Sequence, residues 1–286
     1  AHMSFRGSAD QGQVFGDADS DGPESMISAA AAAMREGHNQ YPPGAGVTEL
    51  RQAISDLERA STGLVRDPDT EVLVTVGATE AIAGAVMGLV ENDDEVVVIE
   101  PYYDSYAATV AMAGATRRAA RMVLADGRYR LDVDSLRSAF SPRTRAVLVN
   151  TPHNPTGAVL PREDLAHIAA LCHEFDAIAI SDEVYEHLTF DGVEHVSIAT
   201  LPGMAERTLR ISSAGKMLNC TGWKVGWATG PAELVAATRA AKQYMTFTGA
   251  TPLQVGVAHA LRHEQEWIGS LRHSLQDRRD QLAEIL

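Results

Sequence analysis

One lysine of this chain stands in a context that could support chemistry. Lys216 lies in the run Ser212-Ser213-Ala214-Gly215-Lys216-Met217, directly after a strand-like segment. A lysine amine condenses with an aldehyde and acts as a base once it is desolvated. A Gly-Lys pair also occurs in nucleotide-binding phosphate loops, but that motif needs glycine and serine or threonine where this chain has Arg210 and Met217. The sequence excludes such a loop, so Lys216 is either a reactive amine or a solvated surface residue.

Other polar and aromatic residues stand near the ends of further strand-like segments. Asp182 ends the segment 177–182, where it could be a buried anion or a helix N-cap. Tyr185 could contact a ligand or be half-buried packing, and Asn154 begins the turn-like run Asn-Pro-Thr-Gly. Tyr103 could stack on a flat ligand, whereas its neighbour Tyr102 is expected to pack. Taken one at a time, these residues do not decide between a functional and a structural role.

Such residues come together when the strands that carry them are parallel. Six short segments rich in β-branched residues predict strands at 72–76, 95–100, 145–150, 177–182, 208–213 and 225–230. Longer amphipathic segments predict helices near 79–91, 103–113, 163–175 and 231–246. This alternation predicts an α/β fold with a mostly parallel sheet between helices. In such a sheet the ligand site lies at the carboxyl ends of the strands, where the loops carrying these residues would meet.

Both ends of the chain show helical patterns. Residues 24–36 are rich in alanine, and residues 252–286 read as one or two long helices rich in arginine, leucine and glutamate. We expect an N-terminal segment (1–35), a large ligand-binding domain (36–250) and a long helix (251–286) that leads toward a small domain.

The composition narrows the classes of partner. The 286 residues are 45% hydrophobic, enough to form a full core, and carry a formal net charge of −14. This charge repels nucleic acid and acidic membrane surfaces, so neither is an expected partner. Two cysteines, together with no 18-residue apolar run and no signal-peptide pattern, predict a cytoplasmic protein. The ten histidines do not lead us to expect a metal site.

Six motifs, in order, give the chain a resemblance to a known family. They are NQYPPGAGVTELR, VLVTVGATEAI, EPYYDSY, NTPHNPTGAV, SDEVYEHLTF and SSAGKMLNCTGWKVGW. Together they resemble the class I/II aminotransferases that depend on pyridoxal 5'-phosphate (PLP), and most closely the kynurenine and N-succinyldiaminopimelate aminotransferase branch. The similarity runs from about residue 36 to residue 286. It implies the aspartate-aminotransferase fold, with a mostly parallel seven-stranded sheet.

The resemblance implies roles for the residues named above. Lys216 would carry PLP as a Schiff base and would move a proton once the amino substrate displaces it. Asp182 would face the pyridine nitrogen and keep it protonated, which makes the ring an electron sink. Tyr185 and Asn154 would hydrogen-bond the phenolic oxygen of PLP, and Tyr103 would stack on its ring. Lys216, Asp182 and Tyr185 are therefore the expected catalytic residues.

The phosphate of PLP needs a compact set of donors. Gly77, Ala78 and Thr79 open a helix directly after a strand, where backbone amides bind anions. Ser213 would add a hydroxyl, and Lys224 a positive charge where many relatives have arginine. Tyr41 matches a tyrosine that reaches the phosphate of the neighbouring subunit, which implies a homodimer; otherwise it packs beside the two prolines that follow it.

The chain departs from the family pattern at both ends. Val14 stands where relatives have a glycine that lies over the substrate. The sequence ends at Leu286, where relatives continue into a small domain that carries an arginine for the substrate carboxylate, so we expect this domain to be largely absent. No arginine near the end stands in the matching context: Arg262, Arg272, Arg278 and Arg279. A fragment, a naturally short protein or a different carboxylate clamp would each explain this.

The expected function is transamination, in which an amino group moves between an amino acid, by resemblance glutamate, and a 2-oxo acid. Two alternatives stay open. The same cofactor would serve a C–S β-lyase, because its electron sink supports several bond cleavages. The fold could also form a non-catalytic binding or regulatory subunit, which would take up PLP without converting any amino acid.

Overall fold

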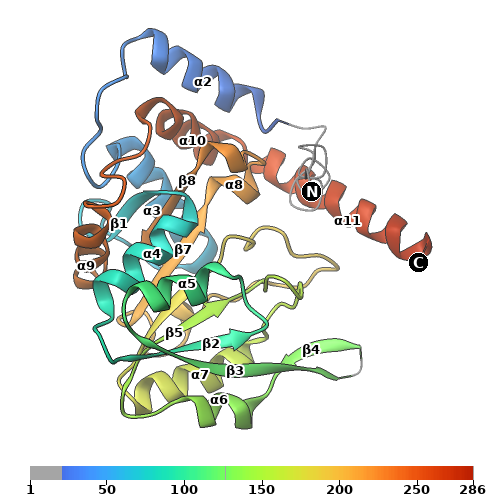
Figure 1. The fold of residues 1–286 in the computed structure, drawn as a ribbon. Coiled ribbons are helices and arrows are strands. Elements are labelled where there is room, and N and C mark those ends of the chain that lie inside the picture. Colours follow the sequence, from blue (N-terminus) through green and yellow to red (C-terminus); the bar gives the residue numbers. More distant parts are fainter. Residues whose placement is uncertain (1–20, 126, 286) are drawn as a thin grey trace, which may run out of the picture.

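Eight strands of the described chain form one sheet at the centre of the protein (Figure 1). The computed structural model describes residues 21–125 and 127–285. The strands are β1 (Val72–Val76), β2 (Glu95–Glu100), β3 (Thr116–Ala125), β4 (Arg128–Leu131), β5 (Thr144–Asn150), β6 (Ile178–Asp182), β7 (Thr208–Ser213) and β8 (Val225–Thr229). They lie side by side in the order β1-β8-β7-β6-β5-β2-β3-β4.

Most neighbouring strands run parallel. The pairs β7–β6, β6–β5, β5–β2 and β2–β3 are parallel, whereas β8 is antiparallel to β1 and β7, and β4 to β3. The predicted α/β fold and mostly parallel sheet are confirmed, and each of the six predicted strands is present. The sheet has one strand more than the seven expected. The hairpin of β3 and β4 is rich in arginine and mostly exposed, so it lacks the apolar pattern of the buried strands.

Helices cover both faces of the sheet and its β1 edge. They are α2 (Glu24–Arg35), α3 (Thr48–Thr62), α4 (Gly77–Leu89), α5 (Ser105–Met112), α6 (Val133–Ala139), α7 (Arg162–Glu174), α8 (Ala214–Met217), α9 (Ala232–Lys242), α10 (Thr251–His263) and α11 (Gln265–Ile285). Each predicted helical segment contains a helix, and α3, α6 and α8 are additions. Helices α4, α5 and α9 cover one face of the sheet, and α6 and α7 cover the other (Figure 1).

Alternate side chains of the buried strands enter two separate hydrophobic clusters. On β2, Val96 and Val98 pack with α4, α5 and α9, whereas Val97 and Ile99 pack with α6 and α7. Successive side chains of a strand point to opposite faces, so a strand covered on both faces appears in the sequence as a continuous apolar run. Because both faces are covered, a ligand can reach the sheet only at the ends of the strands.

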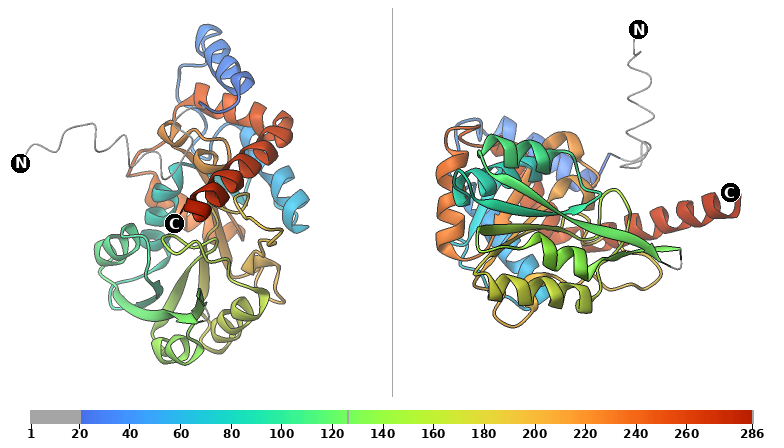
Figure 2. Two further views of the ribbon diagram at one scale, coloured as in Figure 1. Left: turned by 90° about the vertical axis from the view of Figure 1, so that its right-hand side faces the viewer. Right: turned by 60° about the horizontal axis from the view of Figure 1, so that its bottom comes forward.

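A third hydrophobic cluster joins helices from both ends of the chain to β1. Met26 of α2, Leu50 of α3 and Val257 of α10 pack in this cluster with Val74 of β1. Helix α11 extends away from the rest of the protein (Figure 2).

The predicted division of the chain into segments at residues 35 and 250 stays a prediction. None of the described helices combines the length and apolar character needed to span a membrane.

Glycine lets β8 pass close to the start of α4. A Cβ atom on Gly226 would lie 2.5 Å from the carbonyl carbon of Gly77 and 2.7 Å from the backbone nitrogen of Ala78. Side chains do not approach backbone so closely, so only glycine fits at position 226. Gly77 has a φ of +72°, in the left-handed region that favours glycine. The turn from β1 into α4 therefore depends on two glycines.

We predict that Gly226→Ala destabilises the protein, because the added methyl group must displace the backbone at the start of α4. Overpacking of this kind costs about 1–3 kcal/mol, which denaturant unfolding can measure. Gly222→Ala is the matched control, since a Cβ atom there meets no other atom within 4 Å. Equal free energies of unfolding for the two variants would contradict the close approach.

Candidate active site

A cavity of about 300 Å³ opens where the loops after β1, β2, β5, β6 and β7 meet. Its lining consists of Gly77, Ala78, Thr79, Ile82, Tyr103, Asn154, Asp182, Val184, Tyr185, Ser213, Gly215, Lys216, Thr221, Lys224 and Val225. Every residue expected to bind the cofactor lines this cavity except Tyr41. The sequence-based site residues therefore lie together in space, although their individual roles stay predictions.

The pairing of the strands brings the loops to one point. Asn150, the last residue of β5, lies opposite Asp182, the last residue of β6, which in turn lies opposite Ile211 of β7. Strand β2 lies between β5 and β3, so the chain moves to one side of β2 and later returns on the other. Loops that diverge from such a reversal leave a crevice at the carboxyl ends of the strands. The cavity is this crevice.

Lys216 lies on the short helix α8 and is half-buried in the cavity wall. Its Nζ lies 5.5 Å from the centroid of the Tyr185 ring. Burial lowers the pKa of the Lys216 amine, Asp182 opposes this change, and the like charge of Lys224 adds to it. An amine with a lowered pKa spends more time uncharged, which is the form that attacks a carbonyl or accepts a proton.

Asp182 is a carboxylate enclosed in the interior, with 5% of its surface exposed. Its Oδ2 accepts a hydrogen bond of 2.6 Å from the Tyr106 hydroxyl, and its Oδ1 accepts one of 3.3 Å from the backbone N–H of Val184. Burial raises the pKa of Asp182 to about 6, although both hydrogen bonds and the Lys216 charge act to lower it. At neutral pH Asp182 is thus mostly ionised and can pair with a cationic ring nitrogen.

Asn150 fixes the loop that carries Asn154. Its Nδ2 donates to the backbone carbonyl of Asp182 at 2.9 Å, and its Oδ1 accepts from the backbone N–H of Asn154 at 2.7 Å. One side chain thus links the ends of β5 and β6.

Tyr185 is a hydrogen-bond donor at the cavity wall. Burial, with the nearby Asp182 and Tyr103, raises the pKa of Tyr185 to about 12. Its phenol therefore keeps its proton and can donate a hydrogen bond to an oxygen in the cavity.

The start of α4 and Lys224 form a cradle for an anion. Val76 at the N-cap makes no side-chain capping bond, and the first amides of a helix attract anions. A Cβ atom on Gly77 would lie 3.1 Å from the Nζ of Lys224, so glycine leaves room for the ammonium group beside the helix start. Lys224 itself has a φ of +54°, a conformation that is uncommon outside glycine and clusters at functional sites.

The groups around this cavity fit PLP. A phosphate suits the anion cradle, a protonated ring nitrogen suits the buried carboxylate, and an aldehyde suits the lysine amine. The cavity also offers the exposed aromatic ring of Tyr103. The phosphate, the ring nitrogen, the aldehyde and the flat aromatic ring of the cofactor thus each have a matching group in the cavity.

One expected cofactor-binding residue, Tyr41, lies outside this cavity, and two other features named from the sequence are not part of it as described. Tyr41 is 81% exposed, and its ring lies 5.4 Å from that of Phe247. Position 14 lies outside the described residues. The four C-terminal arginines named above are not among the lining residues.

Two residues that were not expected from the sequence, Tyr106 and Asn150, hold predicted site residues in place. Tyr106 lies in the first turn of α5 among apolar residues, so the sequence gives no signal that its hydroxyl meets a carboxylate. Asn150 could have been suspected because it is a polar residue that ends a buried strand.

A buried network of charges lies behind Asp182. Nε of Arg210 donates to Glu183 at 2.6 Å, another guanidinium nitrogen of Arg210 contacts Glu186, and Nε2 of His195 lies 2.9 Å from Glu183. Burial alone would raise the pKa of Glu183, but Arg210 and His195 lower it to about 2. Oxygen and nitrogen atoms of Glu183, Glu186 and His195 lie within 4.8 Å of one another, as metal ligands would. Because Arg210 already pairs with both carboxylates, we assign the group to structural support of the turn after β6.

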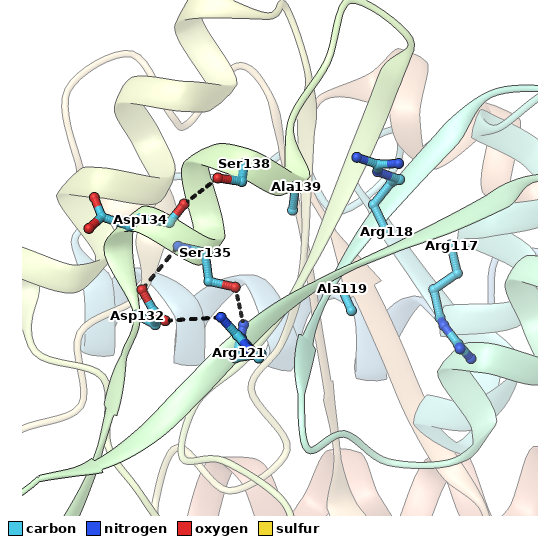
Figure 3. Close-up of a pocket in the computed structure, with 9 residues that line it drawn as sticks. All are labelled: Arg117, Arg118, Ala119, Arg121, Asp132, Asp134, Ser135, Ser138 and Ala139. Carbon is cyan, nitrogen blue, oxygen red and sulfur yellow. Dashed lines mark hydrogen bonds and ion pairs between the residues drawn. The ribbon is translucent and has the colours of Figure 1, made fainter.

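A second hollow, of about 540 Å³, lies between β3 and α6 (Figure 3). Arginines of β3 line it, but Arg121 lies 3.8 Å from Asp132, and Arg118 lies 3.9 Å from Glu95. No residue that we predict to react lies there. The arrangement is that of a solvated, charge-paired surface.

Comparison with known proteins gives a consistent result. The family model "Aminotransferase class I and II" matches residues 10–286. A Mycobacterium tuberculosis protein named "Probable N-succinyldiaminopimelate aminotransferase DapC" is 56% identical over 278 residues, which are 97% of this chain and 69% of that protein. Kynurenine–oxoglutarate transaminase 3 of Rattus norvegicus is 40% identical over an alignment of 270 residues, and the match covers 89% of this chain and 60% of that protein.

Solved structures of related enzymes share the fold. N-succinyldiaminopimelate aminotransferase from Mycobacterium tuberculosis matches with a TM-score of 0.92 at 56% identity, and the match covers 94% of this chain and 70% of the other. A methionine aminotransferase from Escherichia coli matches with a TM-score of 0.90 at 36% identity, covering 99% of this chain and 76% of the other. The chain thus spans about 70% of the length of the mycobacterial enzyme.

We predict that Asp182→Asn stabilises the cofactor-free protein at neutral pH. The pKa of Asp182 is about 6 in the folded protein against a reference value of 3.8, so folding favours the protonated carboxyl group. Stability is therefore greatest below pH 4 and falls as the pH rises through 6, by about 3 kcal/mol at pH 7. Asparagine avoids this loss, and its Oδ1 can still accept from Tyr106; only the long hydrogen bond of 3.3 Å from the Val184 N–H is given up. Urea unfolding should show a stabilised variant at pH 7 and a much smaller difference at pH 4; the same difference at both would contradict the raised pKa.

Proposed function

Because this chain belongs to the class I and II aminotransferase family, we propose that the cavity around Lys216, in a domain of residues 36–250, is its active site. The protein is a PLP-dependent aminotransferase, which moves an amino group between an amino acid and a 2-oxo acid. One observation carries the assignment of the site: a half-buried lysine and a buried carboxylate, Asp182, share one cavity of about 300 Å³.

When bound, PLP supplies an electron sink that stabilises negative charge on the Cα atom of the amino acid. In our proposal the Asp182 carboxylate holds a proton on the ring nitrogen, on which the sink depends. Tyr103 orients the ring through its aromatic face. The amides of residues 77–79, the Ser213 hydroxyl and the Lys224 ammonium group hold the phosphate.

Lys216 is proposed to bond the cofactor through Nζ. Once released, its amine would move a proton between Cα of the amino acid and a carbon atom of the cofactor. Burial and the Lys224 charge lower the pKa of its amine, which favours the uncharged base, while Asp182 opposes them. The phenol of Tyr185 keeps its proton because its pKa is raised to about 12. It can therefore donate a hydrogen bond to the phenolic oxygen of the cofactor, and Asn154 is proposed to bond the same oxygen.

The names of the relatives suggest substrates. The rat relative is named for kynurenine and oxoglutarate, and the mycobacterial relative for N-succinyldiaminopimelate. We propose that glutamate and 2-oxoglutarate form one substrate pair of this protein. A larger amino acid with its 2-oxo acid would form the other pair.

We also propose that the protein is a homodimer in the cytoplasm. Tyr41 and Phe247 form an exposed aromatic pair, and Tyr244, in the same loop as Phe247, is 88% exposed. Exposed aromatic groups of this kind are typical of interfaces. Across such an interface Tyr41 would reach the phosphate of the partner's cofactor. The buried, unpaired Cys172 and Cys220 are consistent with a reducing compartment.

We predict that the PLP-loaded protein converts glutamate into 2-oxoglutarate. Without an acceptor the reaction should stop after one equivalent per chain, because the amino group stays on the cofactor. Lys216→Ala and Lys216→Arg should each lower the rate at least about a hundredfold, as expected for loss of a positioned base. Arginine keeps the charge and so separates the loss of the amine from the loss of charge. Pyruvate and ammonia from a cysteine conjugate, with no product from glutamate, would indicate a β-lyase instead.

Analytical ultracentrifugation is expected to give twice the chain mass of 30.6 kDa. Tyr41→Ala should weaken PLP affinity about tenfold, because it removes a hydrogen bond to a charged group. Tyr129→Ala on β4 is the control, since this tyrosine is 41% exposed and lies away from the loops of the cavity. A monomer mass, or unchanged PLP affinity in Tyr41→Ala, would argue against a shared site.

A further inference from the structure

The side chain of Tyr106 touches the carboxylate that we assign to the cofactor ring. Its hydroxyl donates to Oδ2 of Asp182 at 2.6 Å, which is short for a hydrogen bond between oxygen atoms. Tyr106 is 2% exposed and Asp182 is 5% exposed. Hydrogen bonds to a charged group are stronger in an interior of low dielectric constant than in water. This contact is therefore among the strong interactions of the site.

Packing fixes the direction of the Tyr106 hydroxyl. The ring lies in the hydrophobic cluster under α4 and α5 and meets the ring of Tyr103 edge-on at 5.9 Å and that of Tyr102 in a stacked arrangement at 6.4 Å. The backbone N–H of Tyr106 also donates to the carbonyl of Tyr103 at 3.0 Å. The segment that presents Tyr103 to the cavity thus also holds the ring whose hydroxyl reaches Asp182.

Several charged and titratable groups surround Asp182. Burial and the adjacent Glu183 favour its neutral form, while Tyr106, the Val184 N–H and Lys216 favour its ionised form. Among these favourable influences the Tyr106 hydrogen bond is the largest. Burial and the nearby negative charge raise the pKa of Tyr106 far above its usual value, so its hydroxyl keeps its proton and can only donate to the carboxylate.

We infer that Tyr106 is a positioning residue of the aminotransferase reaction, whose hydroxyl keeps Asp182 ionised and oriented toward the cofactor ring nitrogen. The inference rests on the proposed function, because it takes Asp182 as the partner of that nitrogen. Tyr106 lies behind Asp182 and is not among the residues that line the cavity. It acts on the reaction only through the carboxylate.

The test compares Tyr106→Phe with Tyr102→Phe. Both changes remove one phenolic hydroxyl from neighbouring stacked rings, but only the Tyr106 hydroxyl donates to Asp182. The dissociation constant of PLP is measured for the parent and both variants from pH 5 to pH 8. Titration of the cofactor and of Lys216 is common to all three proteins, so a difference between them reports on Asp182. Carbon-13 NMR of the Asp182 carboxyl in the cofactor-free proteins follows the same ionisation directly.

Tyr106→Phe should bind PLP about tenfold more weakly at pH 7, and both the loss of affinity in acid and the NMR midpoint should move up by about one pH unit. Tyr102→Phe should behave like the parent. Identical profiles for the two variants would overturn the inference, and so would a uniform loss of affinity without a shifted midpoint, which indicates packing alone. If the parent protein bound no PLP at any pH, the proposed function itself would fail. If the parent bound PLP and Tyr106→Phe behaved like it, only the inference about Tyr106 would fail.

Discussion

The burial of one carboxylate, Asp182, is the constraint on which the site depends. Burial raises its pKa to about 6, so at neutral pH the folded protein holds a charge that the interior disfavours. The charge of Lys216, the hydroxyl of Tyr106 and the backbone amide of Val184 compensate for this burial. A cationic ring nitrogen would complete this compensation, so the cofactor-free site is held ready for that charge.

The fold supplies this arrangement through parallel strands that end at one edge. Asn150 and Asp182 lie opposite each other at the ends of β5 and β6, and one asparagine side chain ties the two following loops together. On the other side of the cavity, glycine at positions 77 and 226 lets α4 begin directly above β8. An anion cradle and a buried carboxylate therefore stand at fixed places around the same lysine. The place of the anion cradle is set by a close backbone approach between β8 and the start of α4, which leaves no room for a larger residue at position 226.

Much of this could be predicted from the sequence, because buried parallel strands leave a clear apolar pattern. The bounds of β1, β2 and β7 agree with the predicted segments. Strands β3 and β4 were missed because arginines on an exposed edge break that pattern. Residues such as Lys216 and Asp182 were found through ordered motifs, whereas Tyr106 was not, because a tyrosine in an apolar helix looks like core packing until its hydroxyl is seen beside a carboxylate. The role that we propose for Tyr41 depends on a partner subunit, because its exposed ring lies outside the cavity of its own chain.

The most direct test of the central claim is the position at which PLP becomes attached. The chain contains three lysines, Lys216, Lys224 and Lys242. Borohydride reduction of the PLP-loaded protein, followed by peptide mass analysis, distinguishes them without ambiguity. We expect one adduct per chain, on Lys216. An adduct on Lys224 or Lys242, or none at all, would contradict the assignment of this cavity as the active site.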